Sequence, residues 1–210
     1  MLIAVALSVI HTPPARRLAL RQVQELIRQQ GITLDSSGLD YNLLTGSATL
    51  YNVVIKSQSA PDLPPIAQIA VVNATIEIRQ LLRGSYIITD AKIENPNLHI
   101  LIDSSGRDNI PKVPPSKSTA KTTLILQHLR STGGSFHAEY RRQHIDATLP
   151  LWALAIDGDV ATSTHHIQFQ TGKPGRLGFE DHALPINELS LDATLSDCKE
   201  ISVALKPFLA

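Results

Sequence analysis

A period of two in the placement of apolar residues constrains this chain more than any other feature of its sequence. Two such runs follow one another at residues 86–94 and 98–103. Because successive side chains of a strand point to opposite faces, this alternation predicts two strands that each carry one apolar face. The apolar positions in step are Ile87, Ala91 and Ile93 in the first run and Leu98, Ile100 and Ile102 in the second.

The tripeptide Asn95-Pro96-Asn97 separates the two runs. Pro96 has no N–H to donate to a sheet, and its ring restricts Asn95 to extended conformations, so we expect a kink there. Residues 103–106 then have the composition of a tight turn in which Gly106 takes a positive φ. This segment is thus predicted to be a strand, a kink, a strand and a turn, with one apolar face that offers an oily surface. A nucleotide site or a catalytic triad requires other residues.

The same alternation extends over most of the chain after residue 32. The even positions from 70 to 78 are apolar, and residues 189–195 alternate apolar with polar. The apolar parity changes from Ala48 and Leu50 to Val53 and Ile55, so a bulge near Tyr51-Asn52 is predicted to keep all four on one face. Further strands are expected at residues 124–131, 135–140, 144–157, 164–171, 176–180, 186–195 and 200–204, with turns at 133–134, 157–159 and 173–175.

Residues 12–31 form the one predicted long helix. Pro13 and Pro14 suit a first turn after Thr12 as the N-cap, and Gly31 suits the C′ position. An amphipathic helix of this kind can lie on a membrane surface or cover the first edge of a sheet, and the exposed edge favours the second interpretation. Its apolar stripe consists of Ala19, Leu20, Val23, Leu26 and Ile27.

We therefore predict a mainly β fold, in which this N-terminal amphipathic helix is followed by a curled antiparallel β-sheet that forms an open groove. Nothing after residue 31 has the spacing of a β-α-β unit. Residues 111–123 are rich in proline, serine and lysine without periodicity, and they predict a flexible loop.

Residues 81–111 carry a family resemblance. Their pattern, L-L-R-G-x-Y-x-I-x-D-A-x-I-E-x-P-x-L-x-I-x-x-D-x-x-G-x-x-N-I-P, is similar to the N-terminal signature of the AsmA-like proteins, particularly those grouped with TamB, and residues 39–50 and 67–79 resemble the same region. The resemblance implies a Gram-negative envelope protein that is anchored in the inner membrane and holds a long curled β-sheet groove in the periplasm. Members of the family are linked to phospholipid transport between membranes or to the assembly of outer-membrane proteins.

The resemblance also affects the interpretation of the N-terminus. Residues 1–10 are apolar throughout, but about 20 such residues are needed to span a bilayer. The segment is either a buried first strand or loose end, or the back part of a signal anchor. Because the family carries an anchor at this place, we expect residues 1–11 to be its remnant, followed by the helix at 12–31 and a groove domain at 32–210.

No catalytic, cofactor-binding or metal-binding constellation is expected from the sequence. The 19 basic and 19 acidic residues balance, which argues against a nucleic-acid partner. Ser118 and Lys121 have the spacing of a serine acyltransferase motif but lie in the predicted loop. His165 and His166 are strand neighbours that point to opposite faces, so they cannot share one ion. The remaining histidines considered are interpreted as scattered surface residues: His99, His128, His137, His144 and His182.

The expected function is therefore passive: a membrane-anchored periplasmic groove that shields phospholipid acyl chains between the inner and outer membranes. The alternative is an assembly module whose sheet edge docks an outer-membrane barrel protein. Since strands lie about 4.8 Å apart, a dozen of them span only about 60 Å, which is less than the width of a bacterial periplasm. We therefore expect the native chain to continue past Ala210 or several copies to stack. The predicted groove residues are Val72, Ile76, Ile78, Ile93, Ile100, Leu189 and Leu191.

Overall fold

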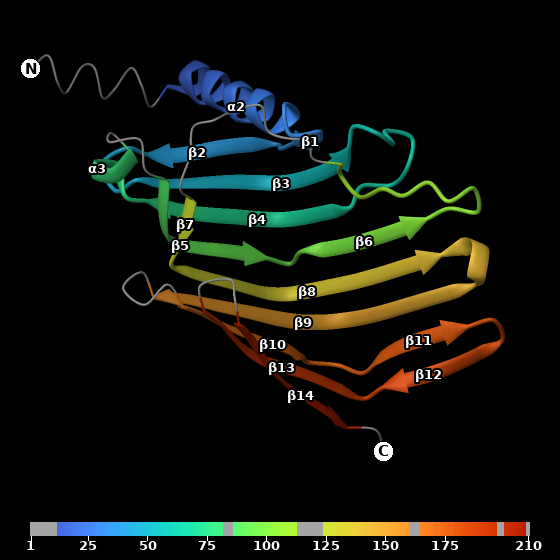
Figure 1. The fold of residues 1–210 in the computed structure, drawn as a ribbon. Helices are drawn as coiled ribbons and strands as arrows, with labels where there is room; N and C mark the ends of the chain where they lie inside the picture. Colours follow the sequence, from blue (N-terminus) through green and yellow to red (C-terminus); the bar gives the residue numbers. More distant parts are fainter. Residues whose placement is uncertain (1–11, 82–85, 113–123, 160–163, 197–199, 209–210) are drawn as a thin grey trace, which may run out of the picture.

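One large β-sheet makes up most of the molecule, and a helix lies along its first edge (Figure 1). The computed structural model describes residues 12–81, 86–112, 124–159, 164–196 and 200–208. The helices are α2 (Pro13–Arg28), α3 (Ile78–Leu81) and the 3-10 helix η1 (Arg141–Gln143). The strands are β1 (Ile32–Asp35), β2 (Gly38–Asn42), β3 (Ser47–Ser57), β4 (Ala67–Ile76), β5 (Tyr86–Glu94), β6 (Asn97–Ile102), β7 (Leu124–Leu126), β8 (His128–Tyr140), β9 (Ile145–Asp159), β10 (Thr164–Thr171), β11 (Gly175–Phe179), β12 (His182–Ile186), β13 (Glu188–Ser196) and β14 (Glu200–Phe208).

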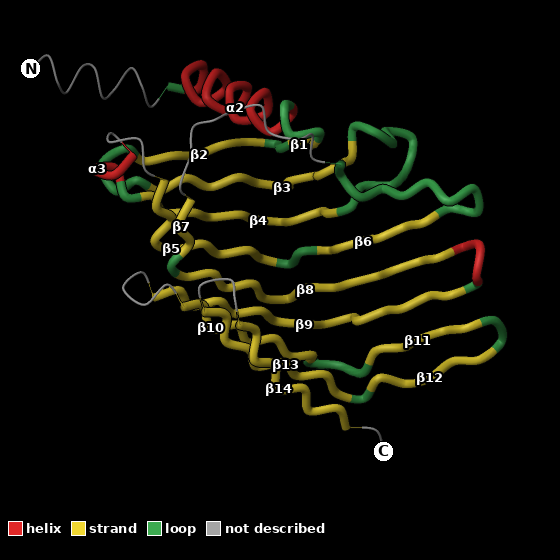
Figure 2. Tube along the Cα trace, in the orientation of Figure 1, coloured by secondary structure: helices red, strands yellow, loops and turns green. Residues whose placement is uncertain are grey.

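Several strands lie end to end and act as one long strand. β1 and β2 both pair with β3, β5 and β6 both pair with β4 and with β8, and β10 and β11 both pair with β9. The order across the sheet is β1-β3-β4-β5-β8-β9-β10-β13-β14. Figure 2 shows how the long strands lie side by side from β2 to β9, while β11 and β12 form a separate arm beyond β9. The predicted mainly β fold with an N-terminal helix is confirmed.

The sheet is mixed, so the prediction of a purely antiparallel sheet is wrong. β5 pairs in parallel with β7 and β8, and β6 pairs in parallel with β8. Residues 103–123 connect β6 to β7, and a connection of that length can return to the end of the sheet where β5 began. Alternation alone shows which residues share a face, but it does not reveal the direction in which the next strand runs.

A row of left-handed residues crosses the sheet near its middle. Asn52, Asn95 and Gly133 have φ values of 49°, 50° and 68°. Asn95 donates its N–H to the carbonyl of Thr132 at 2.8 Å, and a Cβ on Gly133 would overlap Asn95 Oδ1. The prediction that Asn95 is extended is therefore wrong, because asparagine tolerates the left-handed region that bends the strand before Pro96.

The row explains two further differences from the predicted pattern. The irregularity expected near Tyr51-Asn52 falls on the left-handed Asn52, but the pairing of β3 with β4 keeps the same register on both sides, so no extra residue is inserted. Gly133-Gly134 is not a turn, because β8 continues through it with a shifted register against β9. The two glycines therefore lie within one strand and do not form the turn of a hairpin.

Two other predicted turns are also parts of longer structures. Residues 157–159 belong to β9, and residues 173–175 form the joint between β10 and β11. In contrast, the turn at residues 103–106 is confirmed: Gly106 has a φ of 86° and donates its N–H to the carbonyl of Asp103 at 3.0 Å.

Helix α2 packs against β1 and β2, as the lid interpretation predicts. Arg16 forms an ion pair with Asp40 of β2, and Leu18 on the opposite side of the helix is 60% exposed. Thr12 accepts the N–H of Arg16 with its carbonyl at 3.1 Å rather than capping the helix with its side chain. Ala19, Leu20, Val23 and Ile27 are half-buried, whereas the side chain of Leu26 lies outside the described part of the chain, as do the predicted anchor residues 1–11 and most of the loop 111–123.

A small separate core lies beside β6. Ala60, Leu63 and Leu101 are buried together, and Leu101 is 1% exposed. The fully buried Asn109 connects β6 to the loop between β3 and β4: its Oδ1 accepts the N–H of Leu101 at 2.9 Å, and its Nδ2 donates to the carbonyls of His99 and Pro64.

Candidate functional site: the apolar face of the sheet

The register of the strands lines up apolar side chains from strand to strand. Residues that lie opposite one another on paired strands share a face of the sheet. One such row crosses eight strands from β2 to β13, and only Ser131 interrupts it. Its members are Leu39, Leu50, Val72, Ile93, Ser131, Leu154, Phe169 and Leu191.

A second apolar row runs beside the first, two residues along each strand. Its members are Tyr41, Ala48, Ala74, Ala91, Leu129, Ile156, Ile167 and Ala193. We call these two rows together the apolar face. Val72, Phe169 and Leu191 are only half-buried, so within the described part of the chain no second layer of structure seals them from solvent.

The positions between these rows point to the other side, and they are mostly polar. Asn73, Arg130 and Asp192 belong to one polar row, and Thr75, Asp157 and Thr194 to the next. Asp157 binds His128 Nδ1 and Arg130 Nη2, each at 2.8 Å. These hydrogen bonds, that of His128 first, lower the pKa of the Asp157 carboxyl. The sheet therefore has one apolar and one polar face in this half.

A hollow of about 410 Å³ lies over β8, β9, β10 and β13. Its lining includes two side chains of polar-face parity on each of these strands, among them Arg130, Gln168 and Asp192, so it opens on the polar face. Ala153 and Ala155 leave room for it because their side chains are short. None of the predicted groove residues except Leu191 contributes to this lining, and Leu191 forms part of its floor.

Six of the seven predicted groove residues lie in strands, at three places. Val72, Ile93 and Leu191 lie in the first apolar row, and Leu189 follows two residues from Leu191 on β13. Ile76 ends β4 and pairs with Ile88 after a register shift. Ile100 lies on β6 beyond the left-handed row, opposite Ala138 of β8.

Ile78 does not lie in the sheet, so the prediction that the strand continues to residue 79 is wrong. β4 ends at Ile76, and Ile78 begins the short helix α3. A Cβ placed on Gly46 would lie 3.1 Å from Ile78 Cγ1, which puts this side chain against the start of β3. The even spacing of Ile76 and Ile78 could not reveal this, because both a strand and a helical turn can follow such a short run.

Sequence reasoning missed a cluster on β6 and β8. His99 and His137 were expected to be scattered surface residues, but their rings stack with centroids 4.8 Å apart, beside Glu139. The spacing of His137 and Glu139 indicates a shared face of a strand, but the addition of His99 depends on the parallel register. That register has no counterpart in the sequence pattern.

Comparison with known proteins adds no family. The chain matches no protein-family model, and a search of curated proteins finds no significant match. Among the helices that the structure describes, none combines the length and the apolar character needed to cross a membrane.

Proposed function

We propose that this protein is a periplasmic β-sheet protein, tethered to the bacterial inner membrane, whose apolar face shields phospholipid acyl chains during transport between the inner and outer membranes. The observation that carries the proposal is the pair of apolar rows that continues from β2 to β13 without a covering layer among the described residues. The envelope location and the phospholipid substrate come from the AsmA-like resemblance of residues 81–111.

The proposed mechanism requires apolar contact with the acyl chain but no chemical reaction. Each CH₂ group of an acyl chain that rests on an apolar surface avoids a cost of about 0.8 kcal/mol in water. A row that crosses neighbouring strands offers this contact at every step, so a chain can slide from strand to strand without full exposure. The phosphate head group remains in water beside the sheet.

Site-specific photo-crosslinking tests the proposal. A photoreactive residue at Val72 or Leu191 lies on the apolar face, whereas its neighbour Asn73 or Asp192 lies on the polar face of the same strand. We expect phospholipid to be captured at Val72 and Leu191, at least about tenfold more than at Asn73 and Asp192. The neighbours are matched controls, because the backbone position differs by one residue and only the face changes.

Two results would contradict the shielding function. One is equal capture on both faces, since it would show contact without preference. The other is an absence of lipid at all four positions, together with an absence of phospholipid in the mass spectrum of an extract of the purified protein. Either result would leave the assembly function as the better proposal.

The second candidate function is docking of an outer-membrane barrel protein. Along its length β14 pairs with β13, and no other described strand pairs with it. An edge of this kind can accept a strand from a partner through backbone hydrogen bonds. A stable complex with a barrel protein would support assembly over lipid transport, provided that the complex is lost when proline replaces Val203 on β14.

A further inference from the structure

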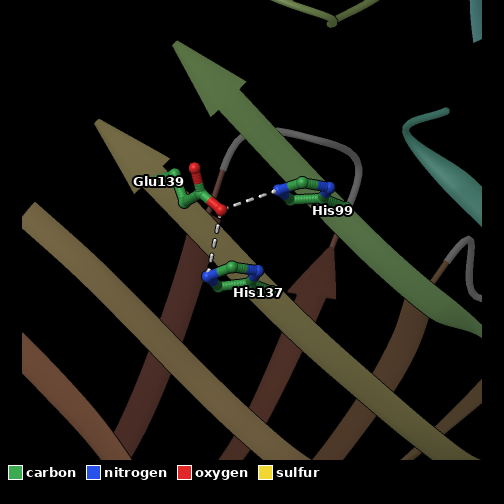
Figure 3. A group of neighbouring side chains, drawn as sticks. All are labelled: His99, His137 and Glu139. Atoms are coloured by element: carbon green, nitrogen blue, oxygen red, sulfur yellow. Dashed lines mark ion pairs between the residues drawn. The ribbon is translucent and has the colours of Figure 1, made fainter. Parts of the chain in front are cut away.

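We propose that His99, His137 and Glu139 form a binding site for a divalent transition-metal ion, with Zn²⁺ as the expected ion, across the parallel seam between β6 and β8. The site is independent of the lipid function proposed above. Figure 3 shows the three side chains, with His99 on one strand and His137 and Glu139 on its neighbour.

The topology of the sheet assembles the three residues. His99 of β6 lies opposite His137 of β8 in the parallel register, so both side chains point to the same face. Glu139 follows His137 by two residues, which returns its side chain to that face. Three potential ligands thus converge from two strands that are far apart in the sequence.

The distances suit a tetrahedral ion. The Nε2 atoms of His99 and His137 each lie 3.6 Å from Glu139 Oε1, and all three ligand atoms lie within 4.8 Å of one another. Zinc binds nitrogen and oxygen at about 2.0–2.1 Å, so the ligand atoms of a tetrahedral site are separated by about 3.4 Å. The two imidazole rings are stacked within 5° of parallel, so both must tilt toward a shared ion before it lies in their planes.

The contacts of Glu139 Oε1 with the two histidines are not ordinary hydrogen bonds. A separation of 3.6 Å is too long for a hydrogen bond between nitrogen and oxygen. Nε2 of His99 is buried and has no hydrogen-bond partner. A buried polar atom without a partner is costly, and a metal ion between the three ligand atoms would satisfy it.

The second oxygen of Glu139 is already held. Arg141 Nε donates to Glu139 Oε2 at 3.0 Å, which orients the carboxylate so that Oε1 points to the two histidines. Partners that fix a ligand in this way raise the affinity of metal sites. The side chain of His137 is 38% exposed, so a fourth position is open to water or to a partner on that side.

The donor set selects the class of ion. Two imidazole nitrogens and one carboxylate oxygen suit zinc, nickel or copper, whereas magnesium and calcium prefer oxygen ligands alone. Because the ligands come from both β6 and β8, the ion would fix the register of the parallel pair.

Metal titration of the full chain without a histidine tag tests this site. All variants carry Cys198→Ser, which removes the one thiol of the chain. We expect one Zn²⁺ per chain by calorimetry, and a visible absorption spectrum of tetrahedral Co²⁺ when cobalt replaces zinc. His99→Gln, His137→Gln and Glu139→Gln should each lower the affinity at least about tenfold, whereas His182→Gln, which changes an exposed histidine on β12, should not.

A second measurement does not depend on the affinity itself. Zinc that binds only the folded state raises the melting temperature, and this rise should disappear in Glu139→Gln, a variant of nearly unchanged side-chain volume. Circular dichroism without metal confirms that each variant is folded. The proposal is overturned if zinc does not bind, or if it binds and stabilises Glu139→Gln as well as the parent protein.

Discussion

At the scale of single residues, backbone conformation and close packing determine which positions of β8 tolerate a side chain. Neither Gly133 nor Gly134 of β8 leaves room for a side chain, but the reasons differ. Gly133 has a positive φ, whereas Gly134 lies under the ring of Trp152, and a Cβ there would overlap the indole carbons. Trp152 is 7% exposed and packs against Phe169 with ring centroids 5.9 Å apart, so it has little room to move.

Gly134→Ala should therefore destabilise the protein by about 2 kcal/mol, the usual cost of overpacking a filled site. The measurement is the free energy of unfolding in urea. Gly38→Ala is the matched control in a strand, because the nearest atom to its Cβ would be 3.9 Å away. Equal stability of the two variants would show that Trp152 is not held over Gly134.

The turn after β6 makes the stability depend on acid. Asp103 accepts hydrogen bonds from the side chain and backbone of Ser105 and from Arg107, and these lower its pKa to about 2. An ordinary aspartate has a pKa of about 3.9. Because the folded state favours the charged form, this contribution to stability is complete above about pH 4 and is lost as the pH falls toward 2.

Asp103→Asn removes this dependence, so we expect the parent to lose more stability than the variant between pH 4 and pH 2. Urea midpoints at both pH values provide the measurement. Asp181→Asn, at an exposed turn position, should follow the parent. If Asp103→Asn and the parent lose stability in parallel, the carboxylate of Asp103 does not contribute in this way.

At the scale of elements, helix α2 and the β1-β2 edge depend on each other. Leu20 and Arg16 of α2 face β2, beside Leu39 and Asp40. The ion pair of Arg16 with Asp40 is partly exposed and contributes little. Most of the docking energy therefore comes from the apolar side of the helix.

Leu20→Asp should weaken this docking and lower the stability by about 2 kcal/mol. Leu18→Asp, two residues earlier and 60% exposed, should change it by less than about 0.5 kcal/mol. The measurement is hydrogen exchange of β1 and β2 together with global unfolding. Similar effects of the two substitutions would contradict the lid.

At the scale of the whole molecule, the apolar face differs from a closed core. Val72 is half-buried on this face, whereas Leu101 is 1% exposed in the small core beside β6. A carboxylate at residue 72 can reach water, but one at residue 101 cannot. The two sites therefore separate an open apolar surface from a sealed one.

Val72→Asp should leave a folded protein that has lost about 1 kcal/mol, whereas Leu101→Asp should lose about 4 kcal/mol or more, because it buries an unpaired charge. Thermal unfolding measures both. Complete unfolding of Val72→Asp would mean that the apolar face is sealed, and the shielding function would then lose its structural basis.

Local alternation in the sequence was enough to predict most strands and the two faces. The run at residues 86–94 coincides with β5, and the alternation of residues 189–195 places Leu191 on the apolar face and Asp192 on the polar one. These features depend on the two-residue repeat of a strand, which can be recognised from neighbouring residues alone. Sequence also predicted helix α2 and the turn that begins at Asp103, because each depends on contacts within a few residues.

The remaining features depend on contacts between residues that are distant in the chain. The parallel pairing of β6 with β8 is one such feature, and it alone brings His99 to His137 and Glu139. Likewise, the dipeptide Gly133-Gly134 is typical of a turn, but it lies within β8, where Asn95 and Trp152 contact it. A residue pattern records which side chains share a face, whereas the register between strands is decided only when the whole sheet has formed.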